Sequence, residues 1–232
     1  MLDSEGFDIW AGDYDASVKE ADESNCYPFA GYRNVMTMIY QTIMHQAPAK
    51  VLDIGFGTGF LTSKLYGAGN EITGIDFSAE MIQIAAAKMP NANLVQWDFT
   101  LDIPLSLSEQ TFDFIVSTYA LHHLNDDQKL TFITQLLMLL DDHGAILIGD
   151  VGFVKRADLL ACMEHDGWDE EEFYFVFSEL EACLSAFCTL TFHQCSQKAI
   201  AAIKRVQIPL DICTLFILNC IALLRLECTH CV

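Results

Sequence analysis

The sequence predicts an α/β fold: a doubly wound, mostly parallel seven-stranded sheet with helices on both faces. Short apolar runs alternate with segments of helical periodicity along most of the chain, which is the pattern of repeated βαβ units. Hydrophobic residues form 52% of the chain and charged residues only 19%, as expected for strands that are buried on both faces. The 232 residues suffice for one such domain with short additions at its ends.

Five parallel strands are expected where apolar runs end in turn residues. The first, at 50–54 (KVLDI), ends in a glycine-rich loop, and the fifth, at 145–151, follows Gly144. Between them lie apolar runs at 71–75, 93–96 and 112–117. Two closing strands, at 188–196 and 199–203, complete the expected seven. Ligands bind such sheets at the carboxyl ends of the strands, so the residues that follow each strand are the candidates for a site.

The helices are predicted from periodicity and capping residues. Ser78 is the expected N-cap of a helix over 79–88. Asn125, with Gln128 three residues later, predicts a capping box at the start of a helix that runs through Leu140. Other helices are expected over 31–45, 61–68 and 170–184.

The expected helix over 170–184 has two interpretations. Four apolar residues recur at helical spacing, as on a helix face that packs on a core: Phe173, Val176, Phe177 and Leu180. The alternative is a lid over an acceptor site, in which Trp168, Tyr174 and the acidic run at 169–172 attract an amine by cation–π and charge interactions. Core packing is the favoured interpretation.

The charge of the chain limits its partners. Its formal net charge is -20, from 32 acidic and 12 basic residues, so nucleic acid is a poor partner and a small or cationic molecule a better one. The first residues, MLDSEGFDIW, have neither the basic start nor the apolar run of a secretory signal, and the nine cysteines are expected to be reduced thiols. These features predict a cytoplasmic protein.

The main candidate for a binding site is the glycine-rich loop after the first expected strand. The sequence Asp53-Ile-Gly55-Phe-Gly57-Thr-Gly59 lies between a strand and a helix, where glycines let the backbone turn tightly and approach a ligand. A dinucleotide-binding loop has the spacing G-x-G-x-x-G, and its sixth position is Phe60 here. NAD binding is therefore disfavoured.

The spacing D-x-G-x-G-x-G resembles the first motif of class I methyltransferases that use S-adenosyl-L-methionine (SAM). Three later segments, each at the end of an expected strand, resemble the family's motifs in the same order: GIDFS at 74–78, VQWDF at 95–99 and FDFIVSTYALHHL at 112–124. The resemblance covers residues 7–204 and is to bacterial members that act on small molecules. It implies the Rossmann-like methyltransferase fold, with SAM as the cofactor.

The resemblance also implies roles for individual residues. In the family, the glycine loop lies against the methionine and ribose parts of SAM, and the carboxylate at the position of Asp76 accepts hydrogen bonds from the ribose hydroxyls. The carboxylate at the position of Asp98 accepts from the adenine amino group, and Trp97 or Phe99 lies on the ring. The cofactor-binding residues expected on this basis are Tyr14, Asp53, Gly55, Gly57, Gly59, Asp76, Phe77, Asp98, Phe99 and Ser117.

Two of these expectations have structural alternatives. The loop after the fourth strand faces the transferable methyl group in the family, so His122 or His123 is expected to take a proton from the acceptor. The alternative is a histidine that only bonds the backbone or packs near the cofactor. Segment 7–15 resembles the N-terminal segment that folds over the cofactor, and there Tyr14 either closes over SAM or anchors the N-terminus.

Three regions are expected along the chain. They are an N-terminal cap and entry helix at 1–48, a SAM-binding catalytic domain at 49–204 and an apolar, cysteine-rich extension at 205–232. The apolar run at 212–224 is shorter than the ~20 residues of a membrane helix, so the extension is expected to be buried on the domain or at a homodimer contact, with a membrane-associated segment as the alternative. The sequence CTHC at 228–231 has no second C-x-x-C pair, and no metal site is expected.

The expected function is therefore SAM-dependent methyl transfer to a small-molecule acceptor. The fourth strand is followed by Ser117-Thr-Tyr-Ala120 and not by the Asn/Asp-Pro-Pro-aromatic sequence of many enzymes that methylate nucleic acids or proteins. Because the reaction is a direct displacement, positioning and desolvation are expected to supply most of the catalysis. The alternative function is a non-catalytic module that binds SAM or a partner without turnover.

Overall fold

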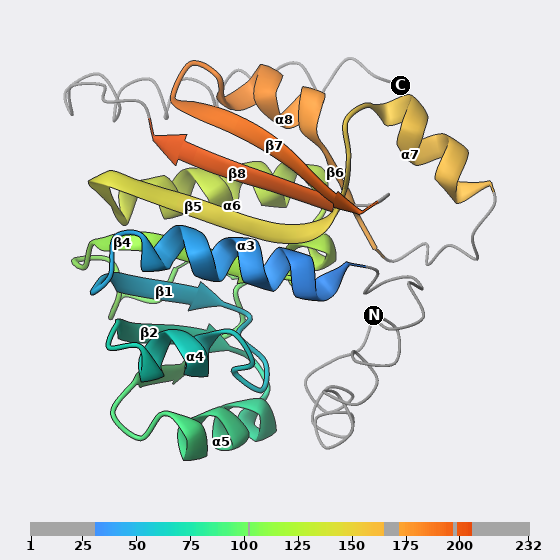
Figure 1. The fold of residues 1–232 in the computed structure, drawn as a ribbon. Coiled ribbons are helices and arrows are strands. Elements are labelled where there is room, and N and C mark those ends of the chain that lie inside the picture. Colours follow the sequence, from blue (N-terminus) through green and yellow to red (C-terminus); the bar gives the residue numbers. More distant parts are fainter. Residues whose placement is uncertain (1–30, 102, 165–171, 197–198, 206–232) are drawn as a thin grey trace.

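The computed structural model describes residues 31–101, 103–164, 172–196 and 199–205, and its sheet confirms the predicted fold class (Figure 1). The strands are β1 (Lys50–Ile54), β2 (Glu71–Asp76), β3 (Asn93–Gln96), β4 (Phe112–Thr118), β5 (Leu140–Phe153), β6 (Phe175–Val176), β7 (Cys188–Ser196) and β8 (Ala199–Arg205). They lie in the order β3-β2-β1-β4-β5-β8-β7, and β6 pairs with one end of β5. The strands β1 to β5 are parallel, whereas β8 is antiparallel to both of its neighbours.

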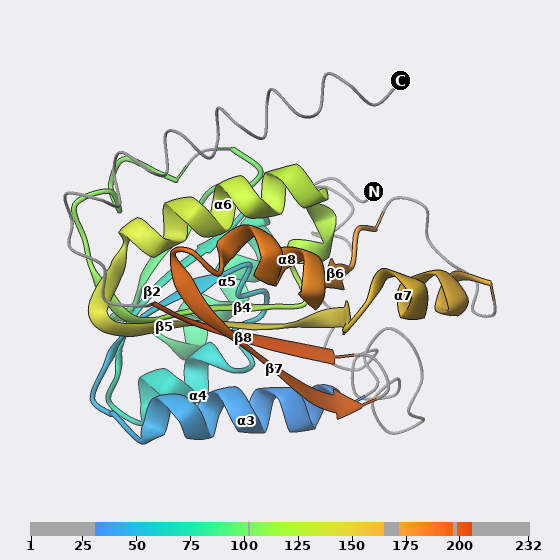
Figure 2. The same ribbon diagram turned by 90° about the horizontal axis from the view of Figure 1, so that it is seen from above.

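This order determines where a ligand can bind. The chain runs outward from β1 through β2 to β3, then crosses back to place β4 on the other side of β1. The loops that leave the adjacent strands β1 and β4 therefore start side by side at the carboxyl edge of the sheet and lead to helices on opposite faces (Figure 2), which is the position of ligand sites in doubly wound sheets.

Helices cover both faces of the sheet, as predicted (Figure 2). They are α3 (Tyr32–Met44), α4 (Thr62–Gly67), α5 (Ala79–Lys88), α6 (Asp126–Met138), α7 (Arg156–Met163), α8 (Phe177–Leu184) and the short 3-10 helix η1 (Leu121–His123). Viewed from above, α3 and α4 lie on one face, and α6 and α8 lie on the other. None of the helices within the described residues is long and apolar enough to span a membrane.

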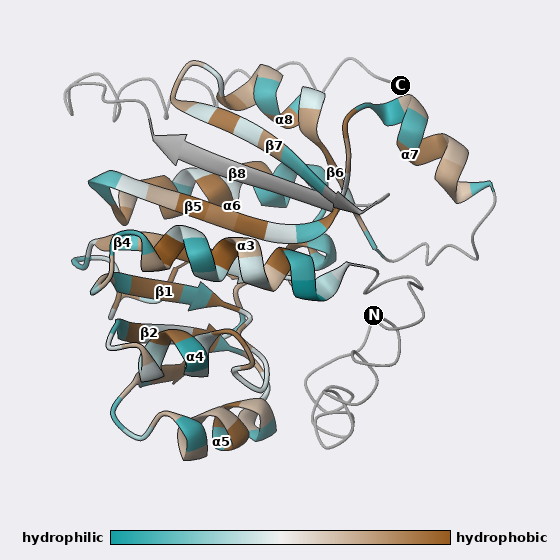
Figure 3. Ribbon diagram, viewed as in Figure 1, coloured by the Kyte–Doolittle hydropathy of each residue, from teal (hydrophilic) through white to brown (hydrophobic). Residues whose placement is uncertain are grey.

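The core consists of two layers, one on each face of the sheet. Successive residues of a strand point to opposite faces, so Val51 packs with α3 while Leu52 packs with α6. Figure 3 shows the resulting apolar colour along the central strands. The helix α3 lies close to the sheet at Gly149, where a Cβ would lie only 2.5 Å from Val35. The packing of the entry helix therefore depends on a glycine in β5.

Both predicted helix starts are confirmed. The hydroxyl of Ser78 accepts a hydrogen bond from the backbone N–H of Met81 at 3.2 Å. Asn125 and Gln128 form the reciprocal capping box, with both bonds at 2.9 Å. Each cap satisfies a backbone donor that the helix itself leaves without a partner.

The region after β5 differs from the prediction. The helix expected over 170–184 begins only at Phe177, because residues 175 and 176 are extended and pair with β5. Phe173 is 41% exposed and so does not join the predicted apolar stripe. The helix α7 was not predicted, and β5 begins at Leu140, whereas its strand was expected from residue 145.

Several expectations concern residues that the structure does not describe. They are Tyr14 and the N-terminal cap before residue 31, the segment 165–171 with Trp168, and the extension at 206–232 with its cysteines.

Candidate functional site

The glycine loop (residues 53–59) leaves the carboxyl end of β1 in a conformation that favours glycine. Gly55, Gly57 and Gly59 have φ angles of 68°, 57° and 75°, a region that L side chains rarely adopt. A Cβ on Gly55 would lie 2.6 Å from the Cβ of Ala120, in the loop after β4, whereas a Cβ on Gly57 would meet nothing within 4 Å. Gly55 therefore allows the loops after β1 and β4 to touch, and Gly57 faces open space.

Asp76 holds the glycine loop from the end of β2. One carboxylate oxygen accepts a hydrogen bond from the backbone N–H of Gly57 at 2.8 Å, and the other accepts from that of Ser78 at 3.0 Å. The side chain is only 4% exposed. The predicted strand-end carboxylate is thus placed against the predicted loop.

Asp53, at the start of the loop, is a buried carboxyl group with one orphaned oxygen. Its Oδ2 accepts a hydrogen bond from the hydroxyl of Thr62 at 2.6 Å, while Oδ1 has no hydrogen-bond partner within the described residues. Burial raises the pKa of Asp53 to about 7; the bond from Thr62 opposes this rise and the charge of Asp76 adds to it. Asp53 lines a small cavity with Gly57, and a cationic group there would satisfy the free oxygen.

The other residues predicted to bind the cofactor lie around this loop. Asp98 is exposed after β3, and its Oδ1 accepts hydrogen bonds from the backbone and the hydroxyl of Thr100. Phe77 is half-buried. Phe99 is buried, with its ring 3.5 Å from the position of a Cβ on Gly55. Ser117 is also buried, and its hydroxyl donates to the carbonyl of Ile54 at 3.1 Å.

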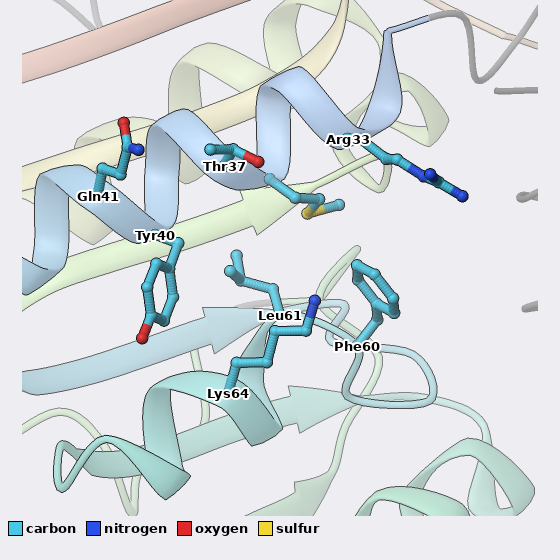
Figure 4. Close-up of a pocket in the computed structure, with 8 residues that line it drawn as sticks. Arg33, Thr37, Tyr40, Gln41, Phe60, Leu61 and Lys64 are labelled. Carbon is cyan, nitrogen blue, oxygen red and sulfur yellow. The ribbon is translucent and has the colours of Figure 1, made fainter. Parts of the chain in front are cut away.

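A larger groove lies beside the glycine loop, between α3 and the start of α4 (Figure 4). It has a volume of about 660 Å³. Phe60 and Leu61 line both this groove and the small cavity at Asp53. Across the groove, residues of α3 face Phe60 and Lys64. The ammonium of Lys64 lies 4.0 Å from the centre of the Phe60 ring. The sequence did not predict this groove.

The loop after β4 places His122 opposite a carboxylate from β5. Nδ1 of His122 lies 2.8 Å from Oδ1 of Asp150, and the backbone N–H of His122 donates to Oδ2 of Asp150 at 3.2 Å. The side chains are 12% and 2% exposed. The ring of His123 stacks at an angle on that of His122, with centroids 4.2 Å apart. Of the two predicted histidines, His122 has the buried carboxylate partner.

Further charged groups surround this pair, and together they form the acceptor-side cluster (His122, Lys129, Asp150, Glu172 and Tyr174). Nε2 of His122 lies 3.9 Å from Glu172, which accepts a hydrogen bond from the hydroxyl of Tyr174. The ammonium of Lys129 donates to the carbonyl of Phe173. Burial lowers the pKa of Lys129 to about 8, although the charges of Asp126 and Asp150 partly oppose this.

The charges of the cluster favour a protonated His122. Burial alone would lower the pKa of His122, but the charge of Asp150, its hydrogen bond and the charge of Glu172 together raise it above its usual value. Asp150 and Lys129 were not predicted as site residues, whereas Glu172 and Tyr174 belong to the segment that was considered as an alternative lid over the acceptor site. Asp150 could have been found, since it lies near the carboxyl end of a predicted strand, but the position of Lys129 depends on the tertiary fold. No group of three metal-ligating side chains is found in the described parts of the chain.

Comparison with known proteins agrees with this geometry. Residues 51–144 match a family model described as a methyltransferase domain. An uncharacterized methyltransferase from Anoxybacillus flavithermus is 38% identical over 150 residues, which are 65% of this chain and 68% of the relative. A solved complex of DhpI with SAH has a TM-score of 0.62 at 20% identity, covering 87% of this chain and 94% of DhpI. The chain belongs to the class I SAM-dependent methyltransferases.

Other methyltransferases extend the comparison. A second uncharacterized relative, from Alkaliphilus oremlandii, is 36% identical over 163 residues, which are 69% of this methyltransferase and 74% of the relative. The N-methyltransferase NodS from Bradyrhizobium japonicum, in complex with S-adenosyl-L-homocysteine (SAH), shares the fold with a TM-score of 0.58 at 17% identity, over 77% of this chain and 89% of NodS. The first supports the membership of this chain in the family, and NodS shows the same fold.

The residues at the carboxyl edge fit the cofactor of this methyltransferase. SAM carries an ammonium group that suits the orphaned oxygen of Asp53, and the open space at Gly57 lets a ligand approach the backbone. SAM is its cofactor, in agreement with the SAM and SAH complexes among the solved structures that share its fold.

Proposed function

We propose that this methyltransferase transfers the methyl group of SAM to a protic small molecule, and that His122 accepts the proton that the acceptor loses. The observation that carries the proposal is the contact between the loops after β1 and β4. Since Ala120 lies against Gly55, η1 with His122 begins at the edge of the proposed cofactor site. A base on this helix would therefore lie beside the proposed cofactor site, where an acceptor must lose its proton.

The cofactor-binding roles follow from the positions of the residues. We assign the ammonium group of SAM to Asp53 and the ribose hydroxyls to Asp76, whose carboxylate already holds the loop. Asp98, exposed after β3, is assigned to the adenine amino group, with Phe77 beside the ring. Gly55, Gly57 and Gly59 shape the loop. Phe99 supports it by packing beside Gly55, and Ser117 supports it by the hydrogen bond to the carbonyl of Ile54.

The residues of the chain orient the reacting molecules and take up the proton that the acceptor loses. SAM supplies an electrophilic methyl group when it is bound. The glycine loop and the strand-end carboxylates orient the cofactor, and the buried surroundings of His122 exclude water from the reacting groups. An acceptor X–H would take the methyl group that SAM supplies when bound, and its proton would go to Nε2 of His122.

Two properties support a small molecule as the acceptor. The net charge of -20 disfavours nucleic acid, and the sequence after β4 lacks the Pro-Pro motif of many enzymes that methylate macromolecules. A partly buried base also suits a small acceptor, since His122 is only 12% exposed.

Calorimetric titration with SAM, SAH and NAD tests the cofactor assignments. We expect SAM and SAH to bind with micromolar affinity and NAD not to bind. Asp76→Asn should abolish SAM binding, because an asparagine amide cannot accept hydrogen bonds from both Gly57 and Ser78. The matched control is Asp113→Asn, in β4, whose carboxylate instead accepts from the backbone of Lys50. Binding of NAD alone, or of nothing by folded protein, would contradict the proposal.

Transfer of a labelled methyl group from SAM to a panel of thiols, phenols, amines and carboxylic acids then tests the acceptor class. We expect wild-type protein to methylate at least one member of the panel. Binding of SAM without transfer to any of them would support a non-catalytic module instead.

A further inference from the structure

A carboxylate outside the predicted site is built around His122. Asp150 accepts three hydrogen bonds: Oδ1 from Nδ1 of His122 and from the backbone N–H of Val151, both at 2.8 Å, and Oδ2 from the backbone N–H of His122 at 3.2 Å. Its side chain is 2% exposed. This buried carboxylate therefore binds both the ring and the backbone of His122.

This arrangement selects one tautomer of His122. Asp150 is an acceptor only, so Nδ1 must carry a proton, and neutral His122 then has its lone pair on Nε2. Nε2 lies 3.9 Å from Glu172, which is too far for a hydrogen bond. The bond from the backbone N–H also limits rotation of the pair, so the direction of Nε2 is set before any acceptor binds.

We propose that Asp150 is a positioning residue for methyl transfer, which holds His122 in the tautomer and orientation that let Nε2 accept the proton of the acceptor. The proposal rests on the proposed function. In this reaction X–H loses its proton to Nε2, the electron pair of X forms the bond to the methyl carbon, and the C–S electron pair stays on sulfur. Asp150 neither gains nor loses a proton and stabilises the imidazolium that forms.

The charged groups that face His122 also set the pH at which it can act. They are Asp150 from β5, Glu172 from the segment before β6 and Lys129 from α6, with His123 and Tyr174 beside the ring. The two carboxylates raise the pKa of His122, and Lys129 opposes them. A base acts in its neutral form, so the rate should rise as the pH rises through the pKa of His122.

Asp150→Asn tests the positioning role directly. An asparagine amide has one acceptor oxygen, so its NH₂ group must face either the backbone N–H of His122, or Nδ1 of His122 together with the backbone N–H of Val151, and in each case it repels a backbone donor. In the second case Nδ1 becomes the acceptor and the proton moves to Nε2, which can then no longer take a proton. We expect kcat to fall roughly 10- to 100-fold with the affinity for SAM unchanged.

Asp113→Asn is the matched control, since it makes the same substitution in the neighbouring strand β4, where the carboxylate accepts from the backbone N–H of Lys50. We expect Asp113→Asn to leave the pH profile and the plateau of kcat at their wild-type values. Asp150→Asn should change both. In a His122→Gln background, Asp150→Asn should cause no further loss, because Asp150 acts only through His122.

Nitrogen NMR of histidine-labelled protein with SAH bound supplies a readout that needs no acceptor. We expect neutral His122 to carry its proton on Nδ1 in the wild type and on Nε2 in Asp150→Asn. A wild-type proton on Nε2 would overturn the proposal even if the variant fails to fold. Equal kcat and pH profiles for Asp150→Asn and wild type would overturn it and leave the proposed function standing. Wild-type protein that binds SAM but methylates no panel member would overturn both.

Discussion

The cofactor side of the site and the acceptor side are held together by different means. On the cofactor side, the loop after β1 depends on backbone conformation: three glycines with positive φ and two backbone N–H groups that Asp76 holds. On the acceptor side, buried charged side chains join the elements: Asp150 of β5 accepts from the ring and backbone of His122, and Lys129 of α6 donates to the carbonyl of Phe173. One backbone bond, from the N–H of Phe173 to the carbonyl of His122 at 2.8 Å, adds to these contacts.

This difference has consequences for substitutions. A backbone-built loop is sensitive to strain, because L side chains rarely adopt its positive φ angles, and at Gly55 also to added atoms, because a Cβ there would meet Ala120. A cluster of buried charges is sensitive to lost partners and to pH, because each remaining charge then lacks its compensation. The two sides should therefore fail in different ways, and each of the following variants tests one side against the other.

The largest effect is expected from Gly55→Ala on the cofactor side. The new methyl group would have to displace Ala120, 2.6 Å away, and would sit at a positive φ. Gly57→Ala, the matched control, has the same kind of φ and open space. We expect the free energy of unfolding to fall by about 2–4 kcal/mol for Gly55→Ala and about 1–2 kcal/mol for Gly57→Ala in chemical denaturation. Equal losses would show that the contact with Ala120 is unimportant.

The contrast between the sides also explains what the sequence could predict. The strand ends, the glycine loop, Asp76 and the caps at Ser78 and Asn125 are local patterns, and the structure places all of them where they were expected. Local signals suffice here because the loop and its anchor lie at the ends of adjacent parallel strands.

The acceptor side could be predicted only in part. His122 and His123 follow β4 in sequence, but nothing local shows that Asp150, 28 residues later, faces one of them. The predicted start of α8, at residue 170, was wrong for a similar reason. Phe173 and Val176 fit a helical stripe, yet pairing of Phe175 with Gly152 in β5 keeps this segment extended. Tertiary pairing thus overrode a helical pattern.

An intermediate effect is expected from pH on the cofactor side. Burial raises the pKa of Asp53 from 3.8 to about 7 in the folded protein, so the contribution of this group to stability is present below pH 3.8 and is lost as the pH rises through about 7. Bound SAM should favour the carboxylate through its ammonium group. We therefore expect affinity for SAM to rise as the pH is raised toward about 7, with proton release on binding.

Calorimetry in two buffers of different ionisation enthalpy measures this proton release. Asp53→Asn should bind SAM more weakly, with no change of affinity over the same pH range and no released proton. The same pH dependence in Asp53→Asn would assign the titration to another group. Asp76→Asn is unsuitable as a control here, because the charge of Asp76 itself contributes to the raised pKa of Asp53.

The smallest effect is expected from two lysines that make the same bond on opposite sides. Lys88 of α5 donates to the carbonyl of Thr58 in the glycine loop at 2.8 Å, and Lys129 of α6 donates to the carbonyl of Phe173. Methionine keeps most of the volume and removes the donor. We expect either substitution to lower the free energy of unfolding by about 1–2 kcal/mol. Lys88→Met should weaken SAM binding about twofold to fivefold, whereas Lys129→Met should leave it unchanged.

Lys129→Met should instead lower the rate of methyl transfer. Loss of the bond to the carbonyl of Phe173 loosens the segment that carries Glu172 and Tyr174 beside His122. The kcat of this variant should fall while the affinity for SAM stays at the wild-type value, and Lys88→Met should show the reverse. The bond of Lys88 stiffens the loop that contacts SAM, and the bond of Lys129 stiffens the segment that faces Nε2 of His122. If both variants changed affinity and kcat together, the two sides would form one coupled unit rather than two separately supported halves.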